Sequence, residues 1–194
     1  MVVKLKYGNT NTFLIRGIYG SLLVDTDVAG TLPGFYRAIK SCGIQISEIT
    51  YVLATHYHPD HMGLISELMK QGVKLLLMDC QCAHVHDSDY IFAREKGLDY
   101  ELIQADKATV ITCEDSRSFL NALGIVGEII STPSHSADCV SLILDNGMCL
   151  VGDLEPMEYL DAYEENEQLT ADWLQILEHN PREIHFAHMP ARKI

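Results

Sequence analysis

The sequence predicts a layered α/β domain with mixed sheets. Short apolar, β-branched segments with strand character alternate along the chain with segments of helical spacing, which is typical of layered α/β folds. The turn Asp145-Asn146-Gly147 indicates a hairpin, so the sheets are expected to be mixed rather than purely parallel. The chain has 194 residues, 47% hydrophobic and 21% charged, which excludes a disordered or fibrous protein. One domain spanning residues 1–194 is expected.

The first part of the chain is predicted to be rich in strands. Its elements, in order, are strands over Val2–Tyr7, Thr12–Arg16 and Ser21–Asp25, a helix over Thr31–Cys42, a strand over Ile49–Ala54, a helix over Met62–Lys70 and a strand over Val73–Met78. The Gly17–Gly20 turn indicates a hairpin. Gly43 and Gly72 each follow a helical pattern and are typical helix stops.

The second part of the chain continues the alternation after an irregular segment, residues 79–107, that predicts short helices and loops. Its elements are a strand over Thr109–Thr112, a helix over Ser116–Leu123, strands over Ile125–Ser131, Val140–Asp145 and Met148–Gly152, a helix over Leu169–His179 and a strand over Ile184–Ala187. Gly124 and Pro181 stop the two helices. No internal repeat or low-complexity linker divides the chain.

Negative charge is concentrated in one stretch. The chain carries 14 Lys and Arg against 27 Asp and Glu, a net charge of −13. Between Arg117 and Arg182 there are twelve acidic residues and no Lys or Arg. Proteins that bind nucleic acid neutralise phosphates with basic residues, so no nucleic-acid partner is expected.

The sequence predicts a cytoplasmic protein without a membrane partner. Residues 1–7 lack the apolar run and the cleavage site of a signal peptide, and no run of 18 apolar residues occurs. The six cysteines contain no C-x-x-C pair and are expected to be reduced. They are Cys42, Cys80, Cys82, Cys113, Cys139 and Cys149.

The most informative segment is Thr55-His56-Tyr57-His58-Pro59-Asp60-His61, directly after a predicted strand. In near-extended backbone, side chains two residues apart point the same way, so His56 and His58 can reach one centre. Asp60 and His61 then turn toward a neighbouring centre. Imidazole and carboxylate ligands suit zinc, and also iron or manganese. The segment therefore predicts a metal site.

This segment, H-x-H-x-D-H, resembles the first motif of the metallo-β-lactamase fold family. Four other segments resemble further motifs of the family, in the right order. They are Asp25-Thr26 (the early D-T-G turn), Thr132-Pro-Ser-His135-Ser (T-P-G-H-T or -S), Val151-Gly-Asp153, and Ala187-His188-Met-Pro190 (G-H-G-P). The resemblance covers nearly the full chain and implies a four-layer αββα sandwich with a metal site at one edge.

The resemblance also implies a dinuclear metal site with seven ligands. Metal one would be bound by His56, His58 and His135, metal two by Asp60, His61 and His188, and both by Asp153. The expected cofactors are two divalent metal ions, with zinc preferred over iron and manganese. Asp60 is the expected catalytic residue, which orients a metal-bound hydroxide and shuttles its proton.

Four positions depart from the family's motifs. Ser134, Ala187 and Met189 replace glycines, and Asp27 stands where the early turn usually has glycine. Glycine allows close backbone approach or positive φ. Ser and Ala are small, so the metal site is expected to survive, whereas Met189 is bulky enough to line the pocket.

The expected function is metal-dependent hydrolysis of a small molecule. Metal binding lowers the pKa of water from about 16 to about 7, so a hydroxide nucleophile is available at neutral pH. Ester, thioester, lactone and phosphodiester substrates all suit this chemistry. Residues 79–107 and 154–170 are expected to shape the pocket. The acidic residues 155–167 are expected to disfavour polyanions, which leaves anion binding mainly to the metals.

Two alternatives from other classes stay open. Persulfide dioxygenases resemble the first motif but use one iron, which would make the protein a mononuclear oxidoreductase. A non-catalytic binding module on the same scaffold is the other alternative. Flavodiiron reductases are not expected, because they carry an acidic residue, which suits iron, at the position of His58. Glyoxalase II relatives carry a C-terminal substrate domain, whereas only six residues follow His188, so this branch is not expected.

Several residues are open to more than one interpretation. The cluster formed by Cys80, Cys82, His84, His86 and Asp87 is interpreted as core cysteines and a polar helix face, as pocket lining, or as another metal site. Tyr57 would pack against the fold or flank the pocket, and Asp25 would support a ligand histidine or only form a turn. Met157, Tyr159 and Tyr163 would form a lid or pack elsewhere. Arg94 and Lys96 are weak candidates for holding an anion, whereas Cys139, His179 and His185 are expected to be structural.

Overall fold

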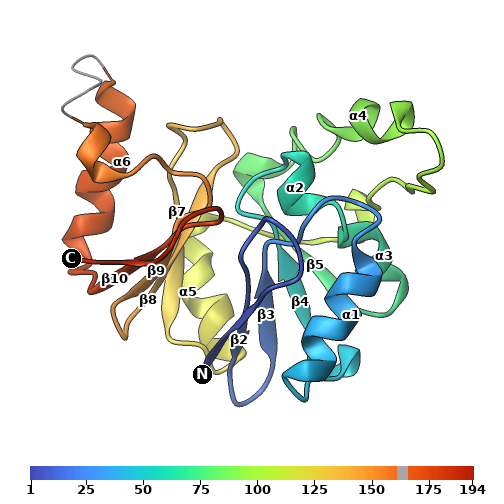
Figure 1. Cartoon of the computed structure of the whole chain (residues 1–194). Coiled ribbons are helices and arrows are strands. Elements are labelled where there is room, and N and C mark those ends of the chain that lie inside the picture. The colour runs from blue at the N-terminus through green and yellow to red at the C-terminus, as the bar shows by residue number, and fades with distance from the viewer. Residues whose placement is uncertain (161–165) are drawn as a thin grey trace.

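The computed structural model describes residues 1–160 and 166–194. Two sheets face each other, with α1 (Leu32–Ser41) and α3 (Ile65–Lys70) on the outer face of the first, α6 (Glu167–Glu178) on the outer face of the second, and α5 (Cys113–Ala122) between them (Figure 1). The first sheet contains β1 (Val2–Leu5), β2 (Thr12–Arg16), β3 (Ser21–Val24), β4 (Tyr51–Leu53), β5 (Lys74–Met78) and β6 (Thr109–Ile111). The second contains β7 (Gly127–Ser131), β8 (Val140–Leu144), β9 (Met148–Leu150), β10 (Glu183–His185) and β11 (Arg192–Lys193).

The helices are short and are spread over both halves of the chain. The α-helices are α1 (Leu32–Ser41), α2 (Pro59–Met62), α3 (Ile65–Lys70), α4 (Asp89–Arg94), α5 (Cys113–Ala122) and α6 (Glu167–Glu178). The 3-10 turns are η1 (Ile46–Glu48), η2 (Asp79–Gln81), η3 (Ala105–Lys107) and η4 (Met157–Tyr159). None of the helices in the described part of the chain is long and apolar enough to cross a membrane.

Both sheets are mixed, as the sequence predicts. In the first sheet the order is β1-β2-β3-β4-β5-β6, with antiparallel pairing up to β3 and parallel pairing from β3 to β6. In the second sheet, β7, β8 and β9 are antiparallel, β9 and β10 are parallel, and β11 closes the edge as an antiparallel strand. The strand β11 is too short and too exposed to give a signal in the sequence.

Three apolar clusters hold the layers together. One lies under α1 and α3 on the outer face of the first sheet and includes Phe35 and Leu68. The second fills the space between the sheets, where Leu120 of α5 meets residues of both. The third packs Trp173 of α6 against the outer face of the second sheet. The result is the expected αββα arrangement.

The helix predicted over residues 62–70 begins later, as α3 at Ile65, and a separate short helix, α2, covers Pro59–Met62. The chain turns between α2 and α3 at Gly63, where an added Cβ would lie 2.3 Å from the backbone nitrogen of Ala29. This close approach requires glycine at position 63. The helix α5 begins at Cys113, before the predicted Ser116, because the Thr112 side chain accepts a hydrogen bond from the Asp115 amide and caps it.

The strand ends explain where the site forms. In parallel strands the carboxyl ends meet at one edge of a sheet. The motif loops containing His56, His135, Asp153 and His188 follow β4, β7, β9 and β10. Val140 of the second sheet donates its amide to the Thr55 carbonyl next to β4, at 2.9 Å, which joins the two sheets at this edge.

Candidate metal centre

Seven predicted ligand side chains lie together at the shared edge of the two sheets. His56 and His58 follow β4, and Asp60 and His61 lie on α2. The second half of the chain supplies His135, Asp153 and His188. Groups of their ligand atoms lie within 4.8 Å of one another in three overlapping sets. The fold therefore brings together residues that are up to 132 positions apart in the sequence.

The first group consists of three histidines. His58 Nδ1 lies 3.0 Å from His56 Nε2 and 3.2 Å from His135 Nε2. Two nitrogen ligands of one tetrahedral Zn²⁺ are separated by about 3.3 Å, given Zn–N bonds of about 2.0–2.1 Å. Three ring nitrogens this close together would bind one shared cation more favourably than they would hydrogen-bond to one another.

The second group contains Asp60, His61 and His188. His188 Nε2 lies 3.1 Å from Asp60 Oδ2 and 3.3 Å from Asp153 Oδ1. His61 Nε2 lies 3.4 Å from the same Asp153 oxygen. Two imidazoles and two carboxylates thus face one point, which is a donor set that divalent metals accept.

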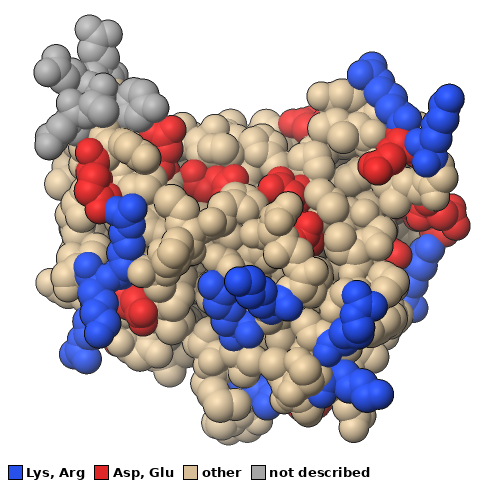
Figure 2. All heavy atoms as spheres, viewed as in Figure 1, with Lys and Arg blue, Asp and Glu red and all other residues tan. Residues whose placement is uncertain are grey.

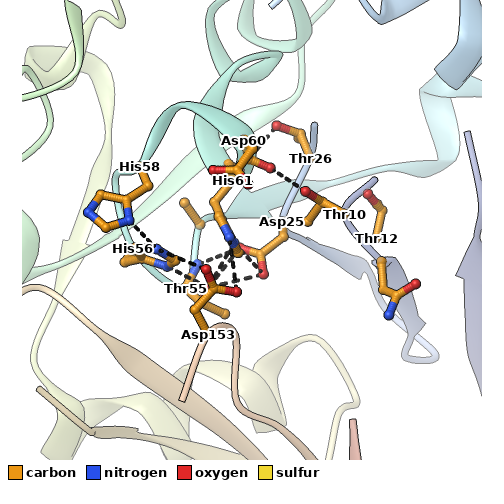
Figure 3. A network of polar contacts seen from close by, with 12 residues as sticks. Thr10, Thr12, Asp25, Thr26, Thr55, His56, His58, Asp60, His61 and Asp153 are labelled. Carbon is orange, nitrogen blue, oxygen red and sulfur yellow. Dashed lines mark hydrogen bonds and ion pairs between the residues drawn. The ribbon is translucent and has the colours of Figure 1, made fainter. Parts of the chain in front are cut away.

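Asp153 lies between the two groups. Its Oδ1 faces His61 and His188, whereas its Oδ2 lies 3.9 Å from both His56 Nε2 and His135 Nε2. Figure 3 shows this carboxylate reaching from the second sheet toward the histidines that follow β4. The carboxylate is positioned to contact an ion in either group.

The loop with Asp153 depends on glycine. Gly152 has φ +57°, and an added Cβ would lie 2.5 Å from Thr55 Oγ1. Only glycine allows the backbone to pass this close to Thr55 with positive φ. The V-G-D sequence therefore sets the position of the carboxylate.

Behind the ligands lies a buried network of Asp25 and Thr55 (Figure 3). Asp25 Oδ2 lies 3.2 Å from His61 Nδ1, and Asp25 Oδ1 accepts hydrogen bonds from the Thr55 amide and hydroxyl at 2.7 and 3.0 Å. Thr55 Oγ1 also lies 3.3 Å from His56 Nδ1. A carboxylate behind a histidine fixes the ring and its tautomer, so that the other nitrogen faces the metal.

The histidines differ in their electrostatic surroundings. Burial and the neighbouring histidines lower the pKa of His56, and burial also lowers the pKa of His135. Burial acts in the same direction on His61, but the carboxylates of Asp25 and Asp153 outweigh it and raise its pKa to about 10. For Asp153, burial is outweighed by the hydrogen bond and charge of His61, so its pKa is lowered.

A metal ion fits these residues. The ring nitrogen Nε2 of His61 is completely buried and has no well-aligned hydrogen bond within the described residues. A buried polar atom whose nearest contact, here the Asp153 oxygen at 3.4 Å, is too long or poorly aligned for a good hydrogen bond is costly, and such atoms commonly mark an absent ion or water. The donor set around it consists of imidazole and carboxylate, which are the ligands zinc prefers.

Comparison with known proteins identifies the family. A family model described as the metallo-beta-lactamase superfamily matches residues 5–188. The chain belongs to the metallo-β-lactamase superfamily. Superfamily members bind divalent metals and are mostly hydrolases.

The curated relatives in the superfamily are distant. A probable metallo-hydrolase from Methanocaldococcus jannaschii is 27% identical over 79% of this chain and 71% of its own length. A lactamase-like protein from Trichophyton rubrum is 37% identical over 34% of this chain, but this covers only 20% of the fungal protein. A hydroxyacylglutathione hydrolase from Rhodopseudomonas palustris is 25% identical over 53% of this chain and 32% of its own length.

Solved structures of superfamily members share the fold over almost the whole chain. An archaeal member from Sulfolobus tokodaii has a TM-score of 0.72 and 18% identity, and covers 99% of this chain and 81% of its own. A family member from Thermus thermophilus has a TM-score of 0.67 and 19% identity, and covers 99% and 74%. At this identity the likeness shows the fold and not the substrate.

Departures from the superfamily motifs are accommodated by local hydrogen bonds. The Ser134 amide donates to Asp172 Oδ2 at 2.8 Å, which ties the His135 loop to α6. The carboxylate of Asp27 accepts from the Thr10 amide at 3.0 Å. Met189 packs against the apolar cluster beneath α6, so its side chain helps to anchor the loop that holds His188.

Supporting residues without any motif hold the ligand loops in place. Buried Gln81 donates to the carbonyls of Ala54, Thr55 and Asp138, and Asp138 in turn accepts the Tyr57 amide at 2.6 Å. On the opposite side, the Thr10 hydroxyl donates to the Asp60 carbonyl at 2.7 Å. Asn11 donates to three carbonyls of the last motif loop, those of Phe186, Ala187 and Met189. Sequence patterns do not reveal these residues, because each acts on backbone that is distant in the sequence.

Other residues with two interpretations are now placed. Tyr57 is 2% exposed and packs into the core, so it does not flank the pocket, and Asp25 contacts His61 as a supporting carboxylate. Cys139 is buried, as expected. His84 and His86 pair through Nδ1 with Asp87 and Asp89, at 2.8 and 2.7 Å, and in the described chain neither belongs to a group that could hold a metal.

The residues predicted to form a lid or to hold an anion are placed as follows. Met157 packs against the apolar cluster under α6, whereas Tyr163 and the acidic residues around it lie outside the described residues. Arg94 stacks over the Tyr90 ring, 5.2 Å from its centroid. The site is bordered by a small cavity of about 140 Å³ lined by Ser134, His135, Glu155, Asn166 and Leu169.

Proposed function

We propose that the protein is a hydrolase with two divalent metal ions, most suitably Zn²⁺, that cleaves a small-molecule ester, thioester, lactone or phosphodiester. The observation that carries the proposal is the position of Asp153, whose two oxygens face two separate groups of ligand atoms. One group is formed by His56, His58 and His135, and the other by Asp60, His61 and His188.

The residues divide the work of the reaction. Two bound divalent ions would lower the pKa of water to about 7 and polarise a carbonyl or phosphoryl oxygen. His56 and His61 are buried, and their Nδ1 ring nitrogens contact Thr55 and Asp25. They would therefore hold the metal ions, and with them the reacting groups, in fixed positions. The carboxylate of Asp60 is 37% exposed, so it can accept the proton of the attacking water and release it to solvent.

The electrostatic surroundings favour neutral or partly cationic substrates. On the face shown in Figure 2, Asp and Glu lie across the upper middle, and Lys and Arg lie below them and at the flanks. Glu155 lines the cavity beside His135, and no Lys or Arg lines that cavity in the described chain. An anionic group of a substrate would therefore be held mainly by the metals.

Thioesters stand first among the substrates to test. The similarity to hydroxyacylglutathione hydrolases, from Rhodopseudomonas palustris and from Nitrobacter hamburgensis, supports a thioester. The matched part covers only 32% and 30% of these two hydrolases. The proposal that this chain also cleaves a thioester rests on that shared part alone.

Metal analysis of protein purified without a metal-affinity tag is the direct test of the dinuclear site. About two zinc ions per chain are expected, and His58→Ala and Asp153→Ala are expected to lower that number. His86→Ala is a matched control, because His86 is exposed and, among the described residues, pairs with Asp89 and no predicted ligand. One iron per chain would instead support the mononuclear oxidoreductase, and no metal would contradict both.

Activity is then tested with a panel of thioester, ester, lactone and phosphodiester substrates. We expect one class to be hydrolysed, with a loss of at least about 100-fold in His58→Ala and Asp153→Ala and none in His86→Ala. Full activity in the two ligand variants would show that the assigned site is wrong. Two bound zinc ions without activity on any class would favour the binding module.

A further inference from the structure

Two thiols occupy matching positions at the ends of neighbouring parallel strands. β5 and β6 pair with Met78 opposite Ile111, and Cys80 and Cys113 each follow two residues later. Adjacent strands are about 4.8 Å apart, and disulfide-bonded cysteines have Cα atoms about 4.4–6.8 Å apart. Cys80 lies in η2 and Cys113 begins α5, so the two cysteines leave the sheet from adjacent strands.

The two side chains also point to the same place. Cys80 and Cys113 both pack against the apolar cluster between the sheets, and a side-chain hydrogen bond joins their thiols. Both are partly exposed, so a small reagent can reach them. This separates them from Cys139 and Cys149, which are buried.

The hydrogen bond makes the two thiols chemically unequal. It lowers the pKa of Cys113 and raises the pKa of Cys80. Thiolate is the reactive form of cysteine, so Cys113, which ionises more readily, reacts first, and Cys80 is the thiol that then forms the disulfide. A partly exposed nucleophilic cysteine beside a second cysteine is the usual arrangement of a reversible thiol pair.

We propose that Cys80 and Cys113 are a modification site, at which hydrogen peroxide forms a reversible disulfide. The Cys113 thiolate attacks one peroxide oxygen, the O–O bond breaks, and a sulfenic acid and hydroxide result. The Cys80 sulfur then attacks the sulfenic sulfur, which releases the oxygen as hydroxide. The two hydroxides take up the two thiol protons as water, so two sulfurs lose two electrons and one peroxide becomes two waters.

The position of the pair links it to the ligand loops. Gln81 follows Cys80 directly and holds the carbonyls of Ala54, Thr55 and Asp138. Ser88, further along the same segment, donates to the Tyr57 carbonyl between two predicted ligands, at 2.6 Å. A disulfide would fasten this segment to the first residue of α5. The proposal does not depend on which bond the protein hydrolyses.

The test uses a variant that keeps the pair and removes the other exposed thiols, Cys42→Ser with Cys82→Ser. After treatment with one equivalent of hydrogen peroxide, we expect a mass loss of about 2 Da and two fewer reactive thiols. Trypsin should yield residues 75–94 joined to residues 108–117, and dithiothreitol should separate the two peptides. Because both substitutions lie at exposed positions, the variant is expected to fold.

Two single variants in that background complete the test. With Cys113→Ser, Cys80 should stay reduced at the same peroxide concentration, whereas with Cys80→Ser a sulfenic acid should form at Cys113 and be trapped by dimedone. The proposal is overturned if peroxide leaves both thiols free while it oxidises Cys42 or Cys82 of the wild-type protein. Direct conversion of Cys113 to sulfinic acid in the presence of Cys80 would also overturn it.

Discussion

Individual side chains in the candidate metal centre have distinct tasks. Three ring nitrogens, of His56, His58 and His135, face one another directly. His61 instead lies between two carboxylates, Asp25 on one side and Asp153 on the other. This difference allows separate tests of the residues that would bind metal and of the residue behind them.

Asp25→Asn should weaken metal binding without removing a ligand. Asparagine keeps the size of the side chain but removes the charge next to His61 Nδ1. Loss of such a supporting carboxylate costs about 10–100-fold in metal affinity. Competition with a chromophoric zinc chelator measures the change. Asp87→Asn, at an exposed carboxylate paired with His84, is the control and should bind as the wild type does.

Metal binding should release a proton from His61. Without metal, the two carboxylates raise the pKa of His61 to about 10, so this ring is protonated at about pH 7.5. A histidine must be neutral to bind metal, so binding expels about one proton and the apparent affinity rises with pH up to about 10. Titration calorimetry in two buffers with different ionisation enthalpies measures the released protons. A heat of binding that is the same in both buffers would show that no proton is released and would contradict the protonation of His61 in the metal-free protein.

At the scale of the elements, glycine positions determine where the ligand loops lie. Gly152→Ala should be strongly destabilising, because it combines φ +57° with a Cβ 2.5 Å from Thr55 Oγ1. Strain of about 1–2 kcal/mol and a clash of about 1–3 kcal/mol are expected together. Gly72→Ala isolates the strain, since its φ is +91° and nothing lies within 4 Å of the added Cβ.

Urea unfolding of the two glycine variants measures both effects. The free energy of unfolding should fall by about 1–2 kcal/mol for Gly72→Ala and by clearly more for Gly152→Ala. Zinc affinity should fall only in Gly152→Ala, because only this glycine precedes a predicted ligand, Asp153. Equal losses of stability in the two variants would mean that the loop moves away from Thr55 without cost.

Most elements could be predicted from the sequence because their signals are local. The strand over residues 12–16 and the helix over 32–41 follow from hydrophobic spacing and from the glycine that ends the helix. The need for glycine at position 63, between α2 and α3, could not be predicted, since it depends on the contact with the backbone of residues 27–29.

The site was partly predictable for the same reason. The ligand positions stand in compact motifs, such as His56 to His61, that are readable along the chain. The supporting residues Gln81 and Asn11 carry no motif, because their partners are carbonyl groups up to 178 positions away. In the sequence, a supporting Asn or Gln cannot be distinguished from any other, because only the fold shows which carbonyl groups its side chain contacts.

At the scale of the whole molecule, bound metal should stabilise the fold. Each ligand group draws residues from both sheets, so the ions would hold the two halves together. An ion present at about 1,000 times its dissociation constant adds about 4 kcal/mol. For a chain of this size that corresponds to a rise in Tm of about 8–16 °C.

Calorimetry with zinc and with excess chelator measures this stabilisation. The wild-type protein should unfold at a clearly lower temperature with chelator, and Asp153→Ala should show a much smaller difference because it lacks the carboxylate between the groups. A Tm that is the same with zinc and with chelator would contradict the metal site.

The spacing of the ligands along the chain has a consequence for biogenesis. Four of the predicted ligands lie within six residues, His56 to His61, whereas the others come after 74 or more further residues. A nascent chain can therefore hold an ion on the first cluster long before its remaining ligands leave the ribosome, since metals also bind unfolded histidine segments. Such an ion would already be bound to the chain when the second sheet docks and supplies His135, Asp153 and His188.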